Sequence, residues 1–152
     1  MTAITFRTKT LAWRDINVGD EVTPLEIPVT TTVIVAGAIA SRDFMPVHHD
    51  REFANKQGSP NLFMNILTTN GLCVRFLTDW AGPEAMVKKL AIRLGVPAFP
   101  DDPLHFTGTV TGKSEGAGGE GFVDIAFKGT NSLGDHVSGS ATISLLEGRV
   151  DA

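Results

Sequence analysis

A carboxylate and an imidazole, five residues apart, are the side chains of this sequence best suited to proton transfer. They belong to Asp43 and His48, and between them lies Pro46, which favours a bend in the chain. If the chain bends there, the two groups converge on one small molecule and can hold one water molecule between them. The segment therefore predicts acid–base chemistry on a small substrate.

The same residue types also have a plainer interpretation. An aspartate and a histidine on a loop are usually solvated or hydrogen-bonded to nearby backbone. His49 is expected to serve a turn or a helix cap, and His105 and His136, on predicted strands, are expected to be structural. Catalysis by Asp43 and His48 therefore needs support from the pattern around them.

Several kinds of site are not favoured by the composition. No H-x-x-H or C-x-x-C spacing is present, so no metal site is expected. The one cysteine, Cys73, excludes an intrachain disulfide and suits a reducing cytoplasm. The glycines of residues 116–121 lack the lysine and the following helix of a phosphate-binding loop. No redox cofactor is implied.

Charge and hydropathy narrow the range of partners. The 152-residue chain has a formal net charge of −4 and one adjacent basic pair, Lys88-Lys89, so nucleic-acid binding is not expected. No run of about eighteen apolar residues occurs, so no membrane-spanning helix is expected. The first residues carry charges where a signal peptide is apolar, so no secretion is expected.

The elements around the loop must hold its side chains in place. Residues 1–28 are expected to form a leader of short extended pieces, before a domain at residues 29–152. Residues 29–40 are rich in β-branched types, which predicts a strand that runs into the loop. After the loop, Asp50 can cap a short helix that ends at Gly58.

The most helical stretch of the chain follows. Residues 62–78 carry apolar side chains around most of the helix circumference, which predicts a helix wrapped by other structure. The Ser-Pro-Asn sequence at residues 59–61 supplies signals for its start, and Trp-Ala-Gly-Pro at residues 80–83 ends it. A helix of this length, at about 1.5 Å per residue, can cross a small sheet.

Four strands are predicted after this helix, at residues 87–96, 104–111, 121–130 and 137–146. Turns rich in Pro, Gly and Asp separate them, so the last strands should pair as an antiparallel meander. The long helix has to cover one face of that sheet. The predicted fold class is α+β, and the arrangement is a hot-dog fold, an antiparallel sheet wrapped around a long central helix.

The residues around the pair match a known family motif. D-F-M-P-V-H-H-D at residues 43–50 resembles the motif D-x-N-P-aliphatic-H-x-D of MaoC-like (R)-specific enoyl-CoA hydratases. The resemblance covers residues 29–146 and implies addition of water to a 2-enoyl-CoA thioester, with CoA only as part of the substrate. Three further stretches look closer to one branch, the small subunit of actinobacterial hydratases that act on steroid side chains: TDWAGP at residues 78–83, LAIRLGVP at residues 90–97 and NSLGDHV at residues 131–137.

Residue roles follow where the motif matches. The resemblance implies that Asp43 and His48 are catalytic, that they orient and activate water, and that they return a proton to the substrate. Donors to the thioester enolate are expected at the start of the long helix. The family often has H-G there and this chain has Met64-Asn65, so the backbone N–H of Asn65 is the expected oxyanion donor. Which member of the pair holds the transferred proton stays open.

One departure from the motif bears on the substrate. Met45 stands where the family has asparagine, so a polar group beside the pair is lost and the site becomes more apolar. An apolar site suits a bulky acyl group such as a steroid side chain. We expect Met45 and Phe63 to contact the substrate.

Two other functions remain open. A hot-dog acyl-CoA thioesterase commonly carries a catalytic carboxylate on or beside the central helix, but residues 62–78 contain no Asp or Glu. A non-catalytic hot-dog subunit would shape the acyl pocket of a partner, but the presence of both Asp43 and His48 favours catalysis in this chain. The resemblance also implies a partner, which completes either a homodimer or a hetero-oligomer with a second hot-dog chain.

Overall fold

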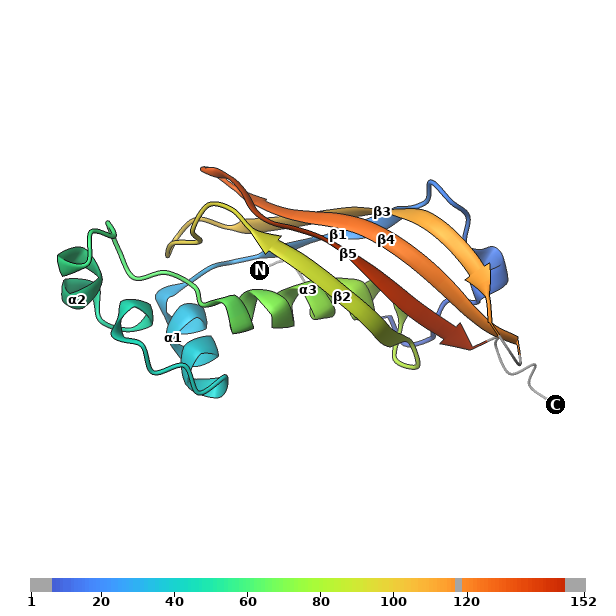
Figure 1. Ribbon diagram of the computed structural model, residues 1–152, viewed down its shortest axis with the longest axis horizontal. Helices are drawn as coiled ribbons and strands as arrows, with labels where there is room; N and C mark the ends of the chain where they lie inside the picture. Colours follow the sequence, from blue (N-terminus) through green and yellow to red (C-terminus); the bar gives the residue numbers. More distant parts are fainter. Residues whose placement is uncertain (1–6, 117–118, 147–152) are drawn as a thin grey trace.

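The computed structural model describes residues 7–116 and 119–146, which form one antiparallel sheet with helices along one face (Figure 1). Within these residues, 3₁₀ turns (η), α-helices and strands follow one another in one order. They are η1 (Trp13–Asp15), β1 (Glu21–Ile27), α1 (Thr31–Ala40), η2 (Pro46–His48), α2 (Arg51–Lys56), α3 (Ile66–Ala81), β2 (Met86–Leu94), β3 (Leu104–Glu115), β4 (Glu120–Asn131) and β5 (Gly134–Leu146).

The sheet has the strand order β1-β3-β4-β5-β2, and every neighbouring pair is antiparallel. The consecutive strands β3, β4 and β5 form the predicted meander. The turn between β4 and β5 uses Gly134, whose φ of 128° is readily adopted only by glycine. All four strands predicted after the long helix are confirmed, and β2, the first of them, lies at one edge of the sheet.

The other edge strand comes from residues 1–28, which the sequence indicates as a leader of short extended pieces. β1 pairs with β3, and Ile27 lies opposite Leu104. In η1, the Nε1–H of Trp13 donates to the carbonyl of Phe122 at 3.1 Å. The described part of this segment therefore packs on the sheet.

The central helix α3 supplies the middle of the core (Figure 1). Its buried side chains include Cys73, Phe76, Leu77 and Trp80. Phe76 stacks on Phe106 of β3, with ring centroids 5.5 Å apart. Burying a side chain of this kind contributes about 1.5–3 kcal/mol. A long helix wrapped by an antiparallel sheet is the hot-dog arrangement, as predicted.

The start of the central helix differs from the prediction. The helix begins at Ile66 instead of Leu62, and its N-cap is Asn65, whose Oδ1 accepts from the N–H of Thr68 at 3.0 Å. The residues just before it are extended because their N–H groups bond to distant parts of the chain. The Ser-Pro-Asn signals belong to the preceding loop and not to the helix.

The strand predicted at residues 29–40 is wrong, because this segment contains the helix α1. Its N-cap is Thr30, whose Oγ1 accepts from the N–H of Val33 at 3.1 Å. The second half of the helix, Ala-Gly-Ala-Ile-Ala, is mostly small residues that let α1 approach α3. This packing and the cap outweigh the modest strand preference of Val, Ile and Thr.

One contact sets the spacing between α1 and α3. A Cβ added at Gly37 of α1 would lie 2.2 Å from Oγ1 of Thr68 and 3.1 Å from its Cβ. Rotating the Thr68 side chain would not relieve this contact, because Cβ itself does not move with the rotation. The closeness of the two helices at this point therefore depends on glycine.

We expect Gly37→Ala to destabilise the fold by about 1–3 kcal/mol, because overpacking outweighs the better helix propensity of alanine. The free energy of unfolding from denaturant titration measures this. Gly71→Ala is the matched control, since a Cβ at this α3 position meets nothing within 4 Å. The control should be neutral or stabilising by up to about 1 kcal/mol. Unchanged stability in Gly37→Ala would contradict the close contact.

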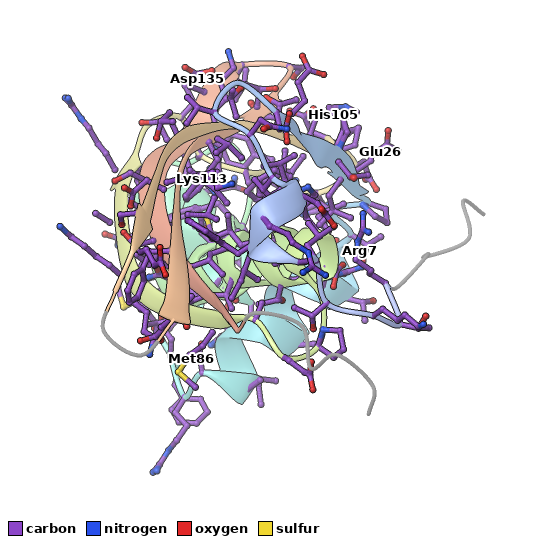
Figure 2. The ribbon with its side chains drawn as sticks, turned by 90° about the vertical axis from the view of Figure 1, so that its right-hand side faces the viewer. Arg7, Glu26, Met86, His105, Lys113 and Asp135 are labelled. Atoms are coloured by element: carbon purple, nitrogen blue, oxygen red, sulfur yellow. The ribbon has the colours of Figure 1, made fainter. Side chains whose placement is uncertain are left out.

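The two strand histidines make structural contacts, as the sequence predicts. His105 lies beside the exposed carboxylate of Glu26, with Nδ1 and Oε2 3.4 Å apart (Figure 2). His136 is buried at an irregularity of the β4–β5 pairing. Its Nδ1–H donates to the carbonyl of Val96 at 2.7 Å, and its Nε2 accepts from the hydroxyl of Thr69 on α3 at 2.9 Å. His136 therefore ties the sheet to the first turns of the central helix.

Folding stability should depend on the protonation of His136. Burial lowers the pKa of its imidazole below the ordinary value of 6.5, so the folded chain holds His136 neutral where the unfolded chain takes up a proton. Stability from this group is complete above about pH 6.5 and falls as the pH drops toward the folded-state pKa, by at most about 1.4 kcal/mol per pH unit. Unfolding titrations of wild type and His136→Gln between about pH 7.5 and 5.5 measure this. Parallel pH curves for the two proteins would contradict it.

Candidate active site

Asp43 is positioned by the turn that ends α1. Arg42 has a left-handed backbone with φ of 57°, and the N–H of Asp43 bonds back to the carbonyl of Ala38 at 2.9 Å. Helices commonly end in this way with glycine at the left-handed position. Here arginine occupies it, at a local cost of about 1 kcal/mol or more. The turn brings the Asp43 carboxylate beside the start of α3, where Asn65 contacts it.

His48 is positioned by η2 and by the chain before α3. Pro46 starts η2 at a position that suits its fixed φ, and His48 ends it and is 7% exposed. The imidazole Nδ1 lies 2.7 Å from the carbonyl oxygen of Phe63, and the two rings meet edge to face with centroids 5.1 Å apart. A carbonyl can only accept, so Nδ1 carries a proton. In the neutral ring, Nε2 is then the acceptor.

The imidazole and the carboxylate face each other across a short gap. Nε2 of His48 lies 3.4 Å from Oδ2 of Asp43. With a neutral ring both atoms are acceptors, so a proton or a donor molecule has to lie between them. The predicted convergence of these two side chains is therefore observed in the geometry.

Each oxygen of the Asp43 carboxylate accepts one hydrogen bond from an N–H group. Its Oδ1 accepts from the N–H of Met45 at 3.3 Å, and its Oδ2 accepts from Nδ2 of Asn65 at 3.0 Å. The Asn65 bond first, then the Met45 bond, lower the pKa of Asp43 below its ordinary value, against the smaller opposing effect of burial, and a protonated His48 lowers it further. Asp43 is therefore ionised at neutral pH.

The start of α3 lies next to this carboxylate. Within residues 7–116 and 119–146, the backbone N–H groups of Asn65 and Ile66 donate to no acceptor. Free N–H groups and the positive end of the helix dipole favour negative charge at this point. The backbone N–H of Asn65, the predicted oxyanion donor, therefore belongs to the helix start that lies next to the Asp43 carboxylate.

The two predicted substrate contacts, Met45 and Phe63, belong to the segments that carry the pair. The side chain of Phe63 packs against the His48 ring, and that of Met45 is 49% exposed. Exposed apolar side chains also occur within four residues of Asp43 or Asn65 along the chain. We call the five of them the apolar rim: Ile39, Phe44, Met45, Ile66 and Leu67.

Sequence reasoning found the pair but missed two side chains that support it. Ser41 and the side-chain amide of Asn65 are hydrogen-bonded to each other, and the amide also contacts Asp43. An asparagine directly before an apolar helix is a common N-cap signal, which would have located Asn65. His49, predicted as a turn residue, lies with Nε2 3.2 Å from the carbonyl of Phe44.

The described part of the chain holds neither a metal-binding cluster nor a membrane-spanning helix. Residues 7–116 and 119–146 contain no group of three or more His, Cys, Asp or Glu side chains arranged to hold a metal ion. None of the helices there is both long enough and apolar enough to cross a bilayer.

The fold and the loop motif can be compared with known proteins. Residues 16–128 match the model of the family described as MaoC like domain. The match covers most of the chain, and the chain belongs to this family, as the motif at residues 43–50 indicates.

A curated relative lies in one branch of this family. The 3-oxo-4,17-pregnadiene-20-carboxyl-CoA hydratase beta subunit of Mycobacterium tuberculosis is 44% identical over 130 residues, which are 86% of this chain and 97% of the relative. A chain of the ChsH1-ChsH2 complex from the same organism superposes with a TM-score of 0.80 at 43% identity, over 85% of this chain and 98% of that chain.

More distant structures share the fold. The (R)-hydratase PhaJ1 from Pseudomonas aeruginosa superposes with a TM-score of 0.81 at 20% identity, over 92% of this chain and 88% of that chain. These likenesses confirm the hot-dog fold, and the curated relative agrees with the steroid side-chain branch that the sequence resembles.

Proposed function

We propose that this chain is an enoyl-CoA hydratase that adds water to the double bond of a 2-enoyl-CoA thioester through Asp43 and His48. The observation that carries the proposal is the 3.4 Å approach of His48 Nε2 to Asp43 Oδ2, beside the start of α3, where two N–H groups donate to no acceptor among the described residues. Membership of the MaoC-like family and the hydratase name of the 44% identical relative support it.

The hydrogen-bond roles of the pair favour a bound water as the reactant. Nδ1 of His48 donates to the carbonyl of Phe63, so Nε2 accepts when the ring is neutral, and the ionised Asp43 accepts as well. A water molecule between them donates one O–H to each. Its lone pairs then remain free to attack a substrate carbon.

The reaction conserves all atoms of water and of the enoyl thioester. The water oxygen bonds to the β-carbon while one water proton passes to the pair, and the π electrons of the double bond move toward the thioester oxygen. N–H groups at the start of α3 stabilise the resulting enolate, and the pair returns the proton to the α-carbon. No redox cofactor or metal takes part in these steps.

The apolar rim suggests the class of acyl group. Its five side chains are between 49% and 65% exposed, and they belong to the end of α1, the Asp43 loop and the start of α3. These segments also carry Asp43 and Asn65, and apolar side chains beside a few polar groups are typical of binding sites. We propose that the rim, with Phe63, binds a large apolar acyl group. The name of the curated relative points to a steroid side chain.

We propose a second hot-dog chain as the partner. The single cysteine, Cys73, suits a reducing cytoplasm as the compartment. β2 is an edge strand and carries the exposed apolar side chains of Met86 and Leu94. An unpaired edge with apolar side chains invites pairing with another strand. The relative is named a beta subunit, and the similar solved structure is a complex of two differently named chains. We therefore favour a hetero-oligomer over a homodimer.

The thioesterase alternative gains no support from the central helix. The one carboxylate on α3, Asp79, lies near the C-terminal end of the helix, opposite to Asn65 and Asp43. It is bound to Arg75 at 3.2 Å.

Purified chain should be assayed for loss of the conjugated thioester absorbance with a short 2-enoyl-CoA and a steroid-side-chain enoyl-CoA. Each substrate should be tested with the chain alone and with a coexpressed hot-dog partner. Hydration without release of free CoA supports a hydratase. Faster turnover of the steroid-side-chain substrate than of the short one supports a large apolar acyl group. CoA release without hydration would show a thioesterase. Equal turnover with and without the partner would contradict the need for a second chain.

A further inference from the structure

The side chain of Asn65 is held in one orientation by the helix that it caps. It is 2% exposed, and its Oδ1 accepts from the N–H of Thr68 at 3.0 Å. A backbone N–H can only donate, so the amide oxygen must face Thr68. The amide NH₂ group then has to face the other way, toward Asp43 and Ser41.

Both hydrogens of this NH₂ group are used. Nδ2 of Asn65 donates to Oδ2 of Asp43 at 3.0 Å and to Oγ of Ser41 at 2.9 Å. The Ser41 hydroxyl in turn donates to the carbonyl of Gly37 at 2.7 Å, so its oxygen is free to accept from Asn65. Since Ser41 caps the end of α1, the amide joins the end of α1 to the start of α3.

The same amide fixes the hydrogen-bond role of the Asp43 carboxylate. Its Oδ1 accepts from the N–H of Met45 and its Oδ2 accepts from Asn65. A carboxylate that accepts N–H bonds on both oxygens is favoured in its charged form. Nε2 of His48 makes no such bond to a donor within the described residues, and its role is acceptor when the ring is neutral.

We propose that Asn65 is a positioning residue whose side chain holds Asp43 as a fixed, ionised acceptor, so that Nε2 of His48 takes the proton from water. This division of roles rests on the proposed hydratase function. It is separate from the backbone N–H of Asn65, which any residue except proline would supply. A glycine at this position would supply the N–H but not the amide.

Two substitutions separate the amide from the helix cap. Asn65→Ser keeps an oxygen that can cap Thr68 but is too short to donate to Asp43. Asn65→Asp keeps both the cap and the shape, but it puts a carboxylate oxygen where the amide donor lies. Two carboxylates that share one site raise the pKa of one of them. Asn55→Ser is the matched control, because the Asn55 amide donates to the carbonyl of Ser59, away from the pair.

The first readout is the pKa of the Asp43 carboxyl group, measured by carbon NMR titration with Asp43→Asn to assign the signal. We expect it to rise in Asn65→Ser, to rise further in Asn65→Asp, and to stay at the wild-type value in Asn55→Ser. The second readout is the pH dependence of kcat. We expect kcat to fall by about 10- to 100-fold in Asn65→Ser with KM nearly unchanged, and the acid limb to move to higher pH in both variants.

The two readouts separate this inference from the proposed function. An unchanged Asp43 pKa in both folded variants, with wild-type kcat and pH profile, overturns the role of Asn65. If the Asp43 pKa rises in the Asn65 variants but the wild-type chain hydrates no enoyl-CoA even with its partner, Asn65 positions Asp43 and the hydratase proposal is wrong. A general loss of thermal stability without an acid-limb shift would show a purely structural cap and would also overturn the inference.

Discussion

Replacing His48 by asparagine is expected to lower the hydration of an enoyl-CoA by about 10²- to 10⁴-fold while the fold is retained. The asparagine NH₂ group lies close to the position of the imidazole Nδ1, so it can keep the bond to the carbonyl of Phe63. It has no atom at the position of Nε2, where the proton of the water is accepted. The substitution therefore removes the chemistry and keeps the structural bond.

The choice of asparagine matters because His48 is buried. Alanine would leave the Phe63 carbonyl without its donor, at a cost of about 1–3 kcal/mol, and would remove the edge-to-face packing of the two rings. The measurements are kcat and KM for one enoyl-CoA and a thermal unfolding curve. His49→Asn, at the exposed neighbouring imidazole, is the control. Near wild-type kcat in folded His48→Asn would contradict the proton-acceptor role.

Asp43→Asn is expected to cause a loss of similar size, about 10²- to 10⁴-fold in kcat. The side chain keeps its shape but loses its charge, so it no longer holds an attacking water as a fixed anionic acceptor. One of its atoms also becomes a donor, which conflicts with the N–H groups of Asn65 and Met45 on the two carboxylate oxygens. The substitution therefore removes both the fixed orientation of the side chain and its negative charge.

The control for this substitution is Asp102→Asn, which changes the same atoms at a carboxylate that accepts from Ser132, away from the site. The assay should be run over a range of pH, because wild-type Asp43 stays charged below the ordinary aspartate pKa of 3.8. Ionised Asp43 is lost only as the pH falls through its lowered pKa. Retention of wild-type turnover by Asp43→Asn at neutral pH would contradict the role of the carboxylate.

The sequence predicted the parts of the fold that local chemistry decides. The strands after the central helix are bounded by turn residues with strong conformational preferences, such as Gly134 with its positive φ. Asp50 caps α2 through the N–H of Phe53 at 3.0 Å, and Gly58 follows the helix with φ of 88°, as predicted. In these places the residue type and the backbone conformation are directly linked.

The two errors of the prediction, a strand at residues 29–40 and the start of the central helix at residue 62, depend on contacts between distant segments. α1 has a β-branched composition, and its helical state is decided by a cap at Thr30 and by packing of Gly37 on Thr68. The start of α3 is decided by hydrogen bonds from the preceding residues to other parts of the chain. The packing of Gly37 on Thr68 and the bonds that fix the start of α3 cannot be read from a window of neighbouring residues.

The candidate site shows the same division. Asp43 and His48 lie in one short motif, so the sequence and the family resemblance indicate them together. The amide of Asn65 joins them from twenty-two residues beyond Asp43, through a bond that only the folded arrangement of α1 and α3 creates. Spacing along the chain could not predict that bond.

The most direct test is hydration of an enoyl-CoA in water labelled with heavy oxygen, by wild type and by the double variant Asp43→Asn/His48→Asn, each with the partner chain present. Mass spectrometry of the product would measure the label. We expect labelled 3-hydroxyacyl-CoA from the wild type and a rate lower by about 10²-fold or more from the folded double variant. Equal label from the two proteins, or none from the wild type, would contradict hydration by this pair.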